Sequence, residues 1–338
     1  MVRGLHYTCT LRGVNDRGLQ LIQIEMPSAS SPVNVYLVLD SPLTLVDTGP
    51  NLTGALTQLE RGLREHGVQV QDLERIVITH PHIDHFGLAR ILRDRSGAEV
   101  WAPAGSEPWL GRFHENGTRI NEWQDALMVR HGVPPGVVAS QQHGAAFRNS
   151  WDPSVPVDRA LADGDTIGFD NREWLVALRP GHSPLDLVFH DEHRGQMILG
   201  DHLIDYISSN PVITPVPGRE EQGRPTALLD YCVSMRKTYD MSASLGLSGH
   251  GGPIYDHRAL IEKRLGAIDR RTEVVGGLVH ESPRSAHSVA REIWGERAAS
   301  EAWLTLSEVL GHVDRLSARG LVREVQSNTG AVVLEPAN

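Results

Sequence analysis

The run THPHIDH at 79–85 constrains this sequence more than any other feature, because it places three histidines and an aspartate within six positions. It directly follows the apolar stretch RIVI, which predicts a buried strand. Alternate residues of an extended segment project to the same side, so His80 and His82 can hold one metal ion. As the chain turns into the next helix, Asp84 and His85 can reach a second ion beside it. Imidazole and carboxylate groups suit zinc, and also manganese or iron.

Three further candidate ligands each follow an apolar stretch: His182, Asp201 and His250. Taken singly, a histidine or aspartate after a strand is more typical of an ordinary turn. These three gain weight because they follow the THPHIDH run in order along the chain. Gly200 and Gly249 directly precede two of them, and a glycine lets the backbone approach a metal closely.

Composition excludes several other classes of protein. The 338 residues, of which 40% are hydrophobic and 22% charged, are those of an ordinary globular chain. A net charge of -10 argues against a protein that coats nucleic acid. Two cysteines, Cys9 and Cys232, cannot build a disulfide scaffold or a four-thiolate zinc site. We find no signal-peptide pattern and no apolar stretch of about 20 residues, so we expect a cytoplasmic protein without membrane segments.

Hydrophobic periodicity predicts a layered α/β architecture, with strands and helices alternating along the chain. The predicted strands lie at 19–24, 33–39, 43–46, 75–78, 99–101, 174–178, 187–189 and 196–199. The predicted helices lie at 54–66, 86–92, 225–240 and 257–278.

The segment 104–156 interrupts this pattern and is rich in Gly, Pro, His and Trp. Long irregular segments inside compact domains are usually functional. One interpretation is a partly helical cap over a pocket. The alternative is a peripheral excursion whose tryptophans pack on the body of the protein.

The last part of the chain predicts a separate small domain. A capped helix is expected to begin at Ser282, with a proline in its first turn, and a second helix spans 301–317. Apolar stretches on both sides of 328–330 predict a hairpin. We therefore predict a catalytic domain at 1–265 and a winged-helix-like domain at 266–338. Such folds often bind DNA, but the acidic chain favours a packing or dimerisation module.

These motifs together resemble the metallo-β-lactamase fold superfamily. The resemblance rests on the Asp47-Thr48-Gly49 turn, the THPHIDH run, His182, Asp201 and His250, and covers roughly residues 20–255. It implies a four-layer αββα sandwich with a site for two divalent metal ions, zinc first, with manganese or iron as alternatives. Within the superfamily, the stretch at 200–211 looks like the subgroup with a C-terminal winged-helix-like domain, which includes the lactamase-β-like endoribonucleases.

The resemblance also implies a role for each motif residue. The first ion is held by His80, His82 and His182. The second is held by Asp84, His85 and His250. Asp201 bridges the two ions, and Asp47 orients the site from behind the ligands.

The chemistry implied is hydrolysis by a hydroxide that bridges the two ions. Asp84 or Asp201 orients this nucleophile or carries its proton. Two residues are candidate substrate contacts, His202 beside the bridging aspartate and Tyr206 shortly after it. The remaining histidines of the 17 are expected to be surface or packing residues, apart from three in the 104–156 segment: His114, His131 and His143.

The expected substrate is a small carboxyl ester, thioester or lactone, because the chain is acidic and the inserted segment carries tryptophans. One alternative is a phosphodiesterase or nuclease, supported by the subgroup resemblance. Another is a DNA-binding regulator with a vestigial metal site, which the complete ligand set disfavours. We expect a small-molecule partner and neither a membrane nor a nucleic acid, and the sequence leaves a homo-oligomer open.

Overall fold

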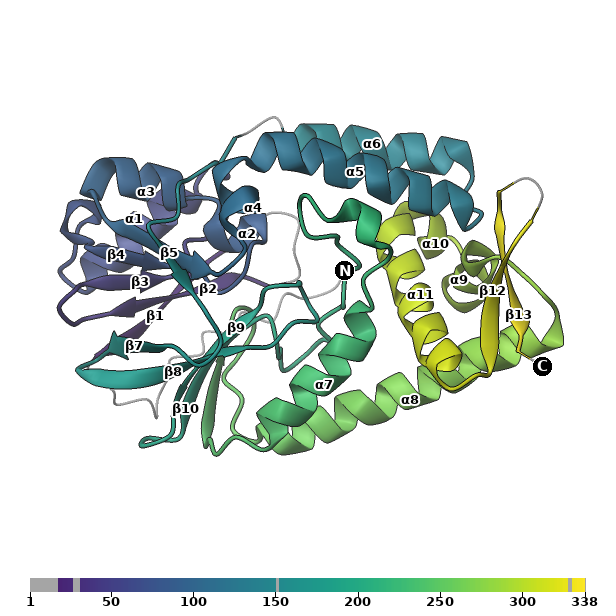
Figure 1. Cartoon of the computed structure of the whole chain (residues 1–338). Coiled ribbons are helices and arrows are strands. Elements are labelled where there is room, and N and C mark those ends of the chain that lie inside the picture. The colour runs from purple at the N-terminus through teal and green to yellow at the C-terminus, as the bar shows by residue number, and fades with distance from the viewer. Residues whose placement is uncertain (1–17, 27–30, 150–151, 328–329, 338) are drawn as a thin grey trace, which may run out of the picture.

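The computed structural model describes residues 18–26, 31–149, 152–327 and 330–337 (Figure 1). A six-stranded sheet holds the N-terminal strands in sequence order. Its strands are β1 (Leu19–Ile24), β2 (Val33–Val38), β3 (Thr44–Val46), β4 (Arg75–Val77), β5 (Glu99–Pro103) and β6 (Arg159–Leu161). The first three pair antiparallel and the last four pair parallel. Every residue of β2 is buried, which suits a strand covered on both faces.

A five-stranded sheet lies against the first, with the order β11-β10-β9-β8-β7. Its strands are β7 (Thr166–Phe169), β8 (Arg172–Leu178), β9 (Leu187–Asp191), β10 (Gln196–Gly200) and β11 (Leu245–Ser248). Within this sheet β10 and β11 pair parallel, and the other neighbouring strands pair antiparallel. The register of this pair shifts between Ile198 and Gly200, directly before Asp201.

Three apolar clusters hold the layers of the sandwich together. The interior between the sheets combines Tyr36 and Val77 of the first with Phe189 and Ile198 of the second. Helices α1 (Ala55–Glu65), α2 (Ile83–Phe86) and α3 (Ala89–Ser96), with the 3-10 turn η1 (Val70–Asp72), cover the outside of the first sheet. Helix α7 (Ala227–Tyr239) and the start of α8 (His257–Glu281) cover the second. The predicted four-layer αββα sandwich is confirmed.

The segment 104–156 is more helical than its composition predicts. It contains α4 (Glu107–Gly111), α5 (Phe113–Arg130) and α6 (Pro135–Asn149), and the last two run side by side away from the sandwich (Figure 1). Trp109 packs in the core beneath the first sheet, and Trp123 packs edge to face on Trp303 of the C-terminal part, with ring centroids 6.3 Å apart. Trp109 therefore packs on the sandwich and Trp123 on the C-terminal part, while Trp151 lies outside the described residues. A cap role stays a prediction.

The C-terminal part contains helices and a two-stranded sheet. After α8 come α9 (Ala286–Trp294), α10 (Arg297–Ser300), α11 (Ala302–Ala318), β12 (Val322–Gln326) and β13 (Val332–Pro336). The expected start at Ser282 is wrong: α8 continues to Glu281, and α9 is capped by Ser285, whose side chain accepts from the amide of Ser288. Residues 328 and 329 of the predicted turn lie outside the described residues.

Helix α8 connects the two parts of the molecule without a break. Ile261 and Ile268 pack over the second sheet, while Val275 and Val279 join the apolar cluster of α9, α11 and the α5–α6 segment. The boundary between residues 265 and 266, and the winged-helix class of the C-terminal part, stay predictions. Among the described residues, no helix is long and apolar enough to span a membrane.

Candidate metal centre

The seven predicted ligands come from five segments and lie together at one end of the sandwich. His80 and His82 follow β4, and Asp84 and His85 lie on α2. His182 follows β8, Asp201 follows β10 and His250 follows β11. Their ligand atoms form two groups and a third that links them through His80, His85 and Asp201. Within each group all ligand atoms lie within 4.8 Å of one another.

The first group joins His80, His82 and His182. His82 Nδ1 lies 3.1 Å from His80 Nε2 and 2.9 Å from His182 Nε2. Three ring nitrogens therefore face one point. This is the set that the resemblance implies for the first ion.

The second group joins Asp84, His85 and His250. Asp84 Oδ2 lies 3.8 Å from His85 Nε2 and 3.4 Å from His250 Nε2. Asp201 lies between the two groups, with Oδ2 3.5 Å from His182 Nε2 and 3.5 Å from His250 Nε2. Its other oxygen lies 3.5 Å from His85 Nε2.

Oxygen partners on the far side of the rings fix which nitrogen faces the centre. His85 Nδ1 donates to Asp47 Oδ2 over 2.8 Å. His182 Nδ1 donates to the carbonyl of Asn210 over 3.2 Å, and His250 Nδ1 donates to the carbonyl of Pro32 over 3.0 Å. Each of these rings therefore presents an unprotonated Nε2 to the centre in its neutral form, as metal-binding histidines do.

Thr79 completes this arrangement for His80. The Thr79 hydroxyl donates its hydrogen to Asp47 Oδ2 over 2.8 Å. Thr79 Oγ1 can therefore accept a hydrogen bond from His80 Nδ1, which lies 2.9 Å away. The Thr79 amide donates to Asp47 Oδ1 over 2.8 Å. Asp47 thus orients ligands of both groups, and its φ of 59° holds it in the left-handed region that non-glycine residues seldom occupy.

Burial and neighbouring charges act in opposite directions on the protonation of this cluster. Burial, together with the neighbouring His182, lowers the pKa of His82 to about 3. Burial also favours neutral His85, but the carboxylates of Asp201 and Asp84 outweigh it and raise the pKa of His85 well above the usual value. A proton and a cation therefore compete for His85.

Two glycines allow the backbone to approach the cluster. A Cβ on Gly249 would lie 2.3 Å from Asp201 Oδ1 and 2.7 Å from His85 Cε1. A Cβ on Gly200, whose φ is 49°, would lie 2.9 Å from Thr79 Oγ1. A side chain fits at neither position without displacing the site, as the sequence predicted for these glycines.

The donor set fits divalent cations. His85 Nε2 and Asp201 Oδ1 are buried and have no hydrogen-bond partner, which is costly unless another group satisfies them. The three ring nitrogens of the first group face one point, where a cation would accept the lone pairs of all three. Imidazole and carboxylate donors of this kind are those that zinc prefers.

The two predicted substrate contacts have different surroundings. His202 is fully buried beneath α7, where its Nε2 lies 2.9 Å from Thr238 Oγ1, so the expectation of a substrate contact is wrong for this residue. Tyr206 is 43% exposed, and its hydroxyl hydrogen-bonds to Ser31 Oγ. Of the other histidines, His143 lies where side chains are not described.

Sequence reasoning missed the residues that hold the ligands from behind. Thr79 lies within the motif itself, and its position between the strand and His80 was a usable signal. Asn34 and Tyr36 on β2 hydrogen-bond to the loop that carries His250. No local pattern links them to a loop more than 200 residues further along the chain.

Comparisons with known proteins agree with this geometry. The family model described as the metallo-beta-lactamase superfamily matches residues 30–230. The "Probable metallo-hydrolase YqjP" of Bacillus subtilis is 32% identical over 302 residues, which are 88% of this chain and 91% of that protein. The human "Acyl-coenzyme A thioesterase MBLAC2" is 27% identical over 198 residues, 56% of this chain and 64% of its own length.

Two solved structures resemble nearly the whole chain. The metallo-beta-lactamase family protein TTHA1429 from Thermus thermophilus has a TM-score of 0.79 at 25% identity, covering 94% of this chain and 98% of its own. A beta-lactamase domain protein from Burkholderia ambifaria has a TM-score of 0.80 at 25% identity, covering 95% of this chain and 92% of its own. Such coverage includes most of the C-terminal part as well as the sandwich.

Proposed function

The chain belongs to the metallo-beta-lactamase superfamily and is a metal-dependent hydrolase, and on that premise we propose that it cleaves a small carboxyl ester, thioester or lactone. The observation that carries the proposal is that five histidines and two aspartates meet in adjoining groups, each small enough to hold one metal ion. In this proposal one group holds one ion through His80, His82 and His182. The other holds a second ion through Asp84, His85 and His250, with Asp201 between the two.

Two zinc ions bound there would supply Lewis acidity and lower the pKa of water to near neutrality. Asp84 and Asp201 then have different roles, because their exposure differs. The Asp84 side chain is 26% exposed and the Asp201 side chain only 7%. We assign the proton transfer to a carboxylate oxygen of Asp84, which solvent reaches, and the orienting role to Asp201.

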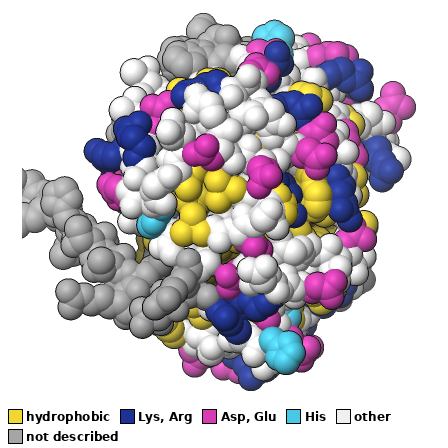
Figure 2. Space-filling view, turned by 90° about the vertical axis from the view of Figure 1, so that its left-hand side faces the viewer, with side chains coloured by type: hydrophobic (Ala, Val, Ile, Leu, Met, Phe, Trp, Pro, Cys, Tyr) yellow, Lys and Arg dark blue, Asp and Glu magenta, His cyan; other side chains and the backbone are white. Residues whose placement is uncertain are grey.

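Two observations support an acyl substrate. Tyr206 and Ile207, 43% and 44% exposed, follow Asp201 along the chain and offer apolar surface in the segment after this ligand. The human relative that matches part of the chain is an acyl-coenzyme A thioesterase by name. A polyanionic substrate suits the chain less well, because its net charge is -10. On the face shown in Figure 2, acidic and basic side chains are intermixed.

The test is a substrate screen of the zinc- and manganese-loaded protein with esters, thioesters, lactones and bis-nitrophenyl phosphate. We expect turnover of a carboxyl substrate, and its loss in Asp201→Ala and His82→Ala. His193→Ala, at an exposed position on the β9–β10 turn, is the matched control and should keep full activity. Hydrolysis of the phosphodiester alone would replace the proposed substrate class with a phosphodiesterase.

A further inference from the structure

The loop that carries His250 is held by the first sheet, although it leaves the second. The backbone amide of Asn34 on β2 donates to the carbonyl of Gly249 over 2.7 Å, and Val33 forms a β-bridge with His250. Tyr36, two residues along the same strand, donates from its hydroxyl to the carbonyl of Ser248 over 2.6 Å. Strand β2 thus contacts the loop directly before and at His250.

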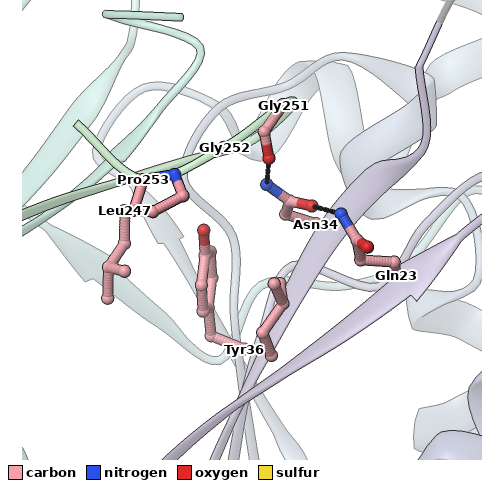
Figure 3. Close-up of a pocket in the computed structure, with 8 residues that line it drawn as sticks. Gln23, Asn34, Tyr36, Leu247, Gly251, Gly252 and Pro253 are labelled. Carbon is pink, nitrogen blue, oxygen red and sulfur yellow. Dashed lines mark hydrogen bonds between the residues drawn. The ribbon is translucent and has the colours of Figure 1, made fainter. Parts of the chain in front are cut away.

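The Asn34 side chain brackets His250 from both sides. Its Nδ2 donates to the carbonyl of Ser248 over 2.9 Å and to the carbonyl of Gly251 over 3.0 Å. These carbonyls belong to the residues two before and one after His250. Figure 3 shows Asn34 reaching from β2 to Gly251. One amide group therefore fixes both ends of a short stretch of backbone with His250 inside it.

The orientation of the Asn34 amide is itself fixed. Gln23 on β1 donates from Nε2 to Asn34 Oδ1 over 3.0 Å, which leaves Nδ2 as the nitrogen that faces the loop (Figure 3). Asn34 is 2% exposed, so water competes little for these bonds. An amide fits the place, because two carbonyls need two donated hydrogens and the Gln23 amide needs an acceptor.

We propose that Asn34, oriented by Gln23, is a positioning residue that holds His250 Nε2 toward Asp84 and Asp201. The proposal rests on the proposed function, in which His250 holds the second ion. The Pro32 carbonyl, which lies two residues before Asn34, receives His250 Nδ1–H. Strand β2 therefore sets both the place of the ring and the nitrogen that faces the centre. Partners of this kind typically contribute about 10–100-fold to metal affinity.

The experiment measures the affinities of the full chain for two zinc ions, by competition with a chromophoric chelator. Cobalt spectra of the same variants report the coordination of each ion. His250→Ala identifies the ion that depends on this ligand. We expect Asn34→Ala to lower the affinity for that ion about 10–100-fold and to leave the affinity for the other ion unchanged. An equal loss of affinity for both ions, or a loss for neither, would overturn the inference.

Asn116 provides a matched control on α5. It is also 2% exposed, and its Nδ2 donates to two carbonyls, those of Pro108 at 2.6 Å and Arg112 at 3.1 Å. Asn116→Ala should lower stability without changing either zinc affinity. If Asn34→Ala does not fold, Gln23→Met decides: a smaller loss at the His250-dependent ion supports the inference, and unchanged affinity overturns it.

Failure of the inference and failure of the proposed function give different results. If His250→Ala leaves both affinities unchanged, the ligand assignment and the proposed function fail. Suppose instead that His250→Ala lowers the affinity for one ion, while Asn34→Ala folds and binds both ions as tightly as the unaltered chain. Only the positioning role of Asn34 then fails.

Discussion

His85 Nδ1 donates to Asp47 Oδ2 over 2.8 Å, and neither side chain is more than 3% exposed. The same carboxylate accepts from the amide and hydroxyl of Thr79, which in turn accepts from His80. One buried aspartate therefore orients a ligand in each of the two groups.

Removing this carboxylate should loosen both rings. We expect Asp47→Ala to lower kcat/KM by about 10–100-fold, because His85 loses its acceptor. The Thr79 hydroxyl, which accepts from His80, also loses the carboxylate that orients it. Steady-state kinetics with saturating zinc would check it. Asp240→Ala, at an exposed position directly after α7, is the control. Unchanged kinetics in Asp47→Ala would limit Asp47 to a turn role.

Removing the metal ions should lower the stability of the fold as well as abolish activity. Chelation leaves the nitrogens of His80, His82 and His182 facing one another without a shared cation. Zinc in thousandfold excess over its Kd stabilises a fold that binds it by about 4 kcal/mol. Thermal melts with EDTA, and again after zinc is restored, should show a reversible drop in Tm. Identical melts in both states would contradict the donor set.

A methyl group at Gly249 should disrupt the centre, since its Cβ would lie 2.3 Å from Asp201 Oδ1. We expect Gly249→Ala to lose at least one zinc equivalent, measured by elemental analysis of the dialysed protein. Gly277→Ala is the matched control on α8, where a Cβ meets nothing within 4 Å. That change should keep the zinc content and raise stability by up to about 1 kcal/mol, because alanine favours the helix.

Arg264 on α8 holds the loop that follows Asp201. Its Nη2 donates to the carbonyls of Ile204 at 3.0 Å, Asp205 at 3.2 Å and Ile207 at 2.6 Å. Arg264→Ala leaves these carbonyls without that donor, so we expect a loss of about 1–3 kcal/mol in unfolding free energy and a raised KM. Arg270→Ala, exposed on the same helix, should change neither in urea unfolding and kinetics.

The helical part should become less stable in acid through His312. Burial, with Arg315 nearby, lowers the pKa of His312 to about 3, against about 6.5 in the unfolded chain. The folded state then binds fewer protons between these values. The stability contributed by neutral His312 is complete above pH 6.5 and is lost as the pH falls toward 3.

Urea unfolding at pH 7 and pH 5 measures this effect. His312→Gln should reduce the loss of unfolding free energy between the two pH values by about 2 kcal/mol, since each pH unit below 6.5 costs up to about 1.4 kcal/mol. His193→Gln, at an exposed position, should leave the pH dependence as it is. An equal loss in His312→Gln would mean that His312 does not carry it.

Most of the sandwich could be predicted because its strands and helices are strongly periodic. The predicted strand at 19–24 matches β1 at both ends, and the helix predicted at 54–66 matches α1 within a residue at each end. The segment 104–156 was harder, since α5 and α6 have weak amphipathic patterns and complete their packing only against α11. The predicted start of α9 lies too early in the chain, because Ser282 and Ser285 both resemble helix caps.

Residue types and their spacing were enough to predict the donors and the strand ends that carry them, because both limit the chemistry of a site. The tertiary structure alone decided how each ring is turned. His250 takes its orientation from Pro32 and Asn34, more than 200 positions away, and His202 points to Thr238 rather than to the centre. Hydrogen bonds between distant segments depend on how the two sheets pack, and no local pattern encodes that packing.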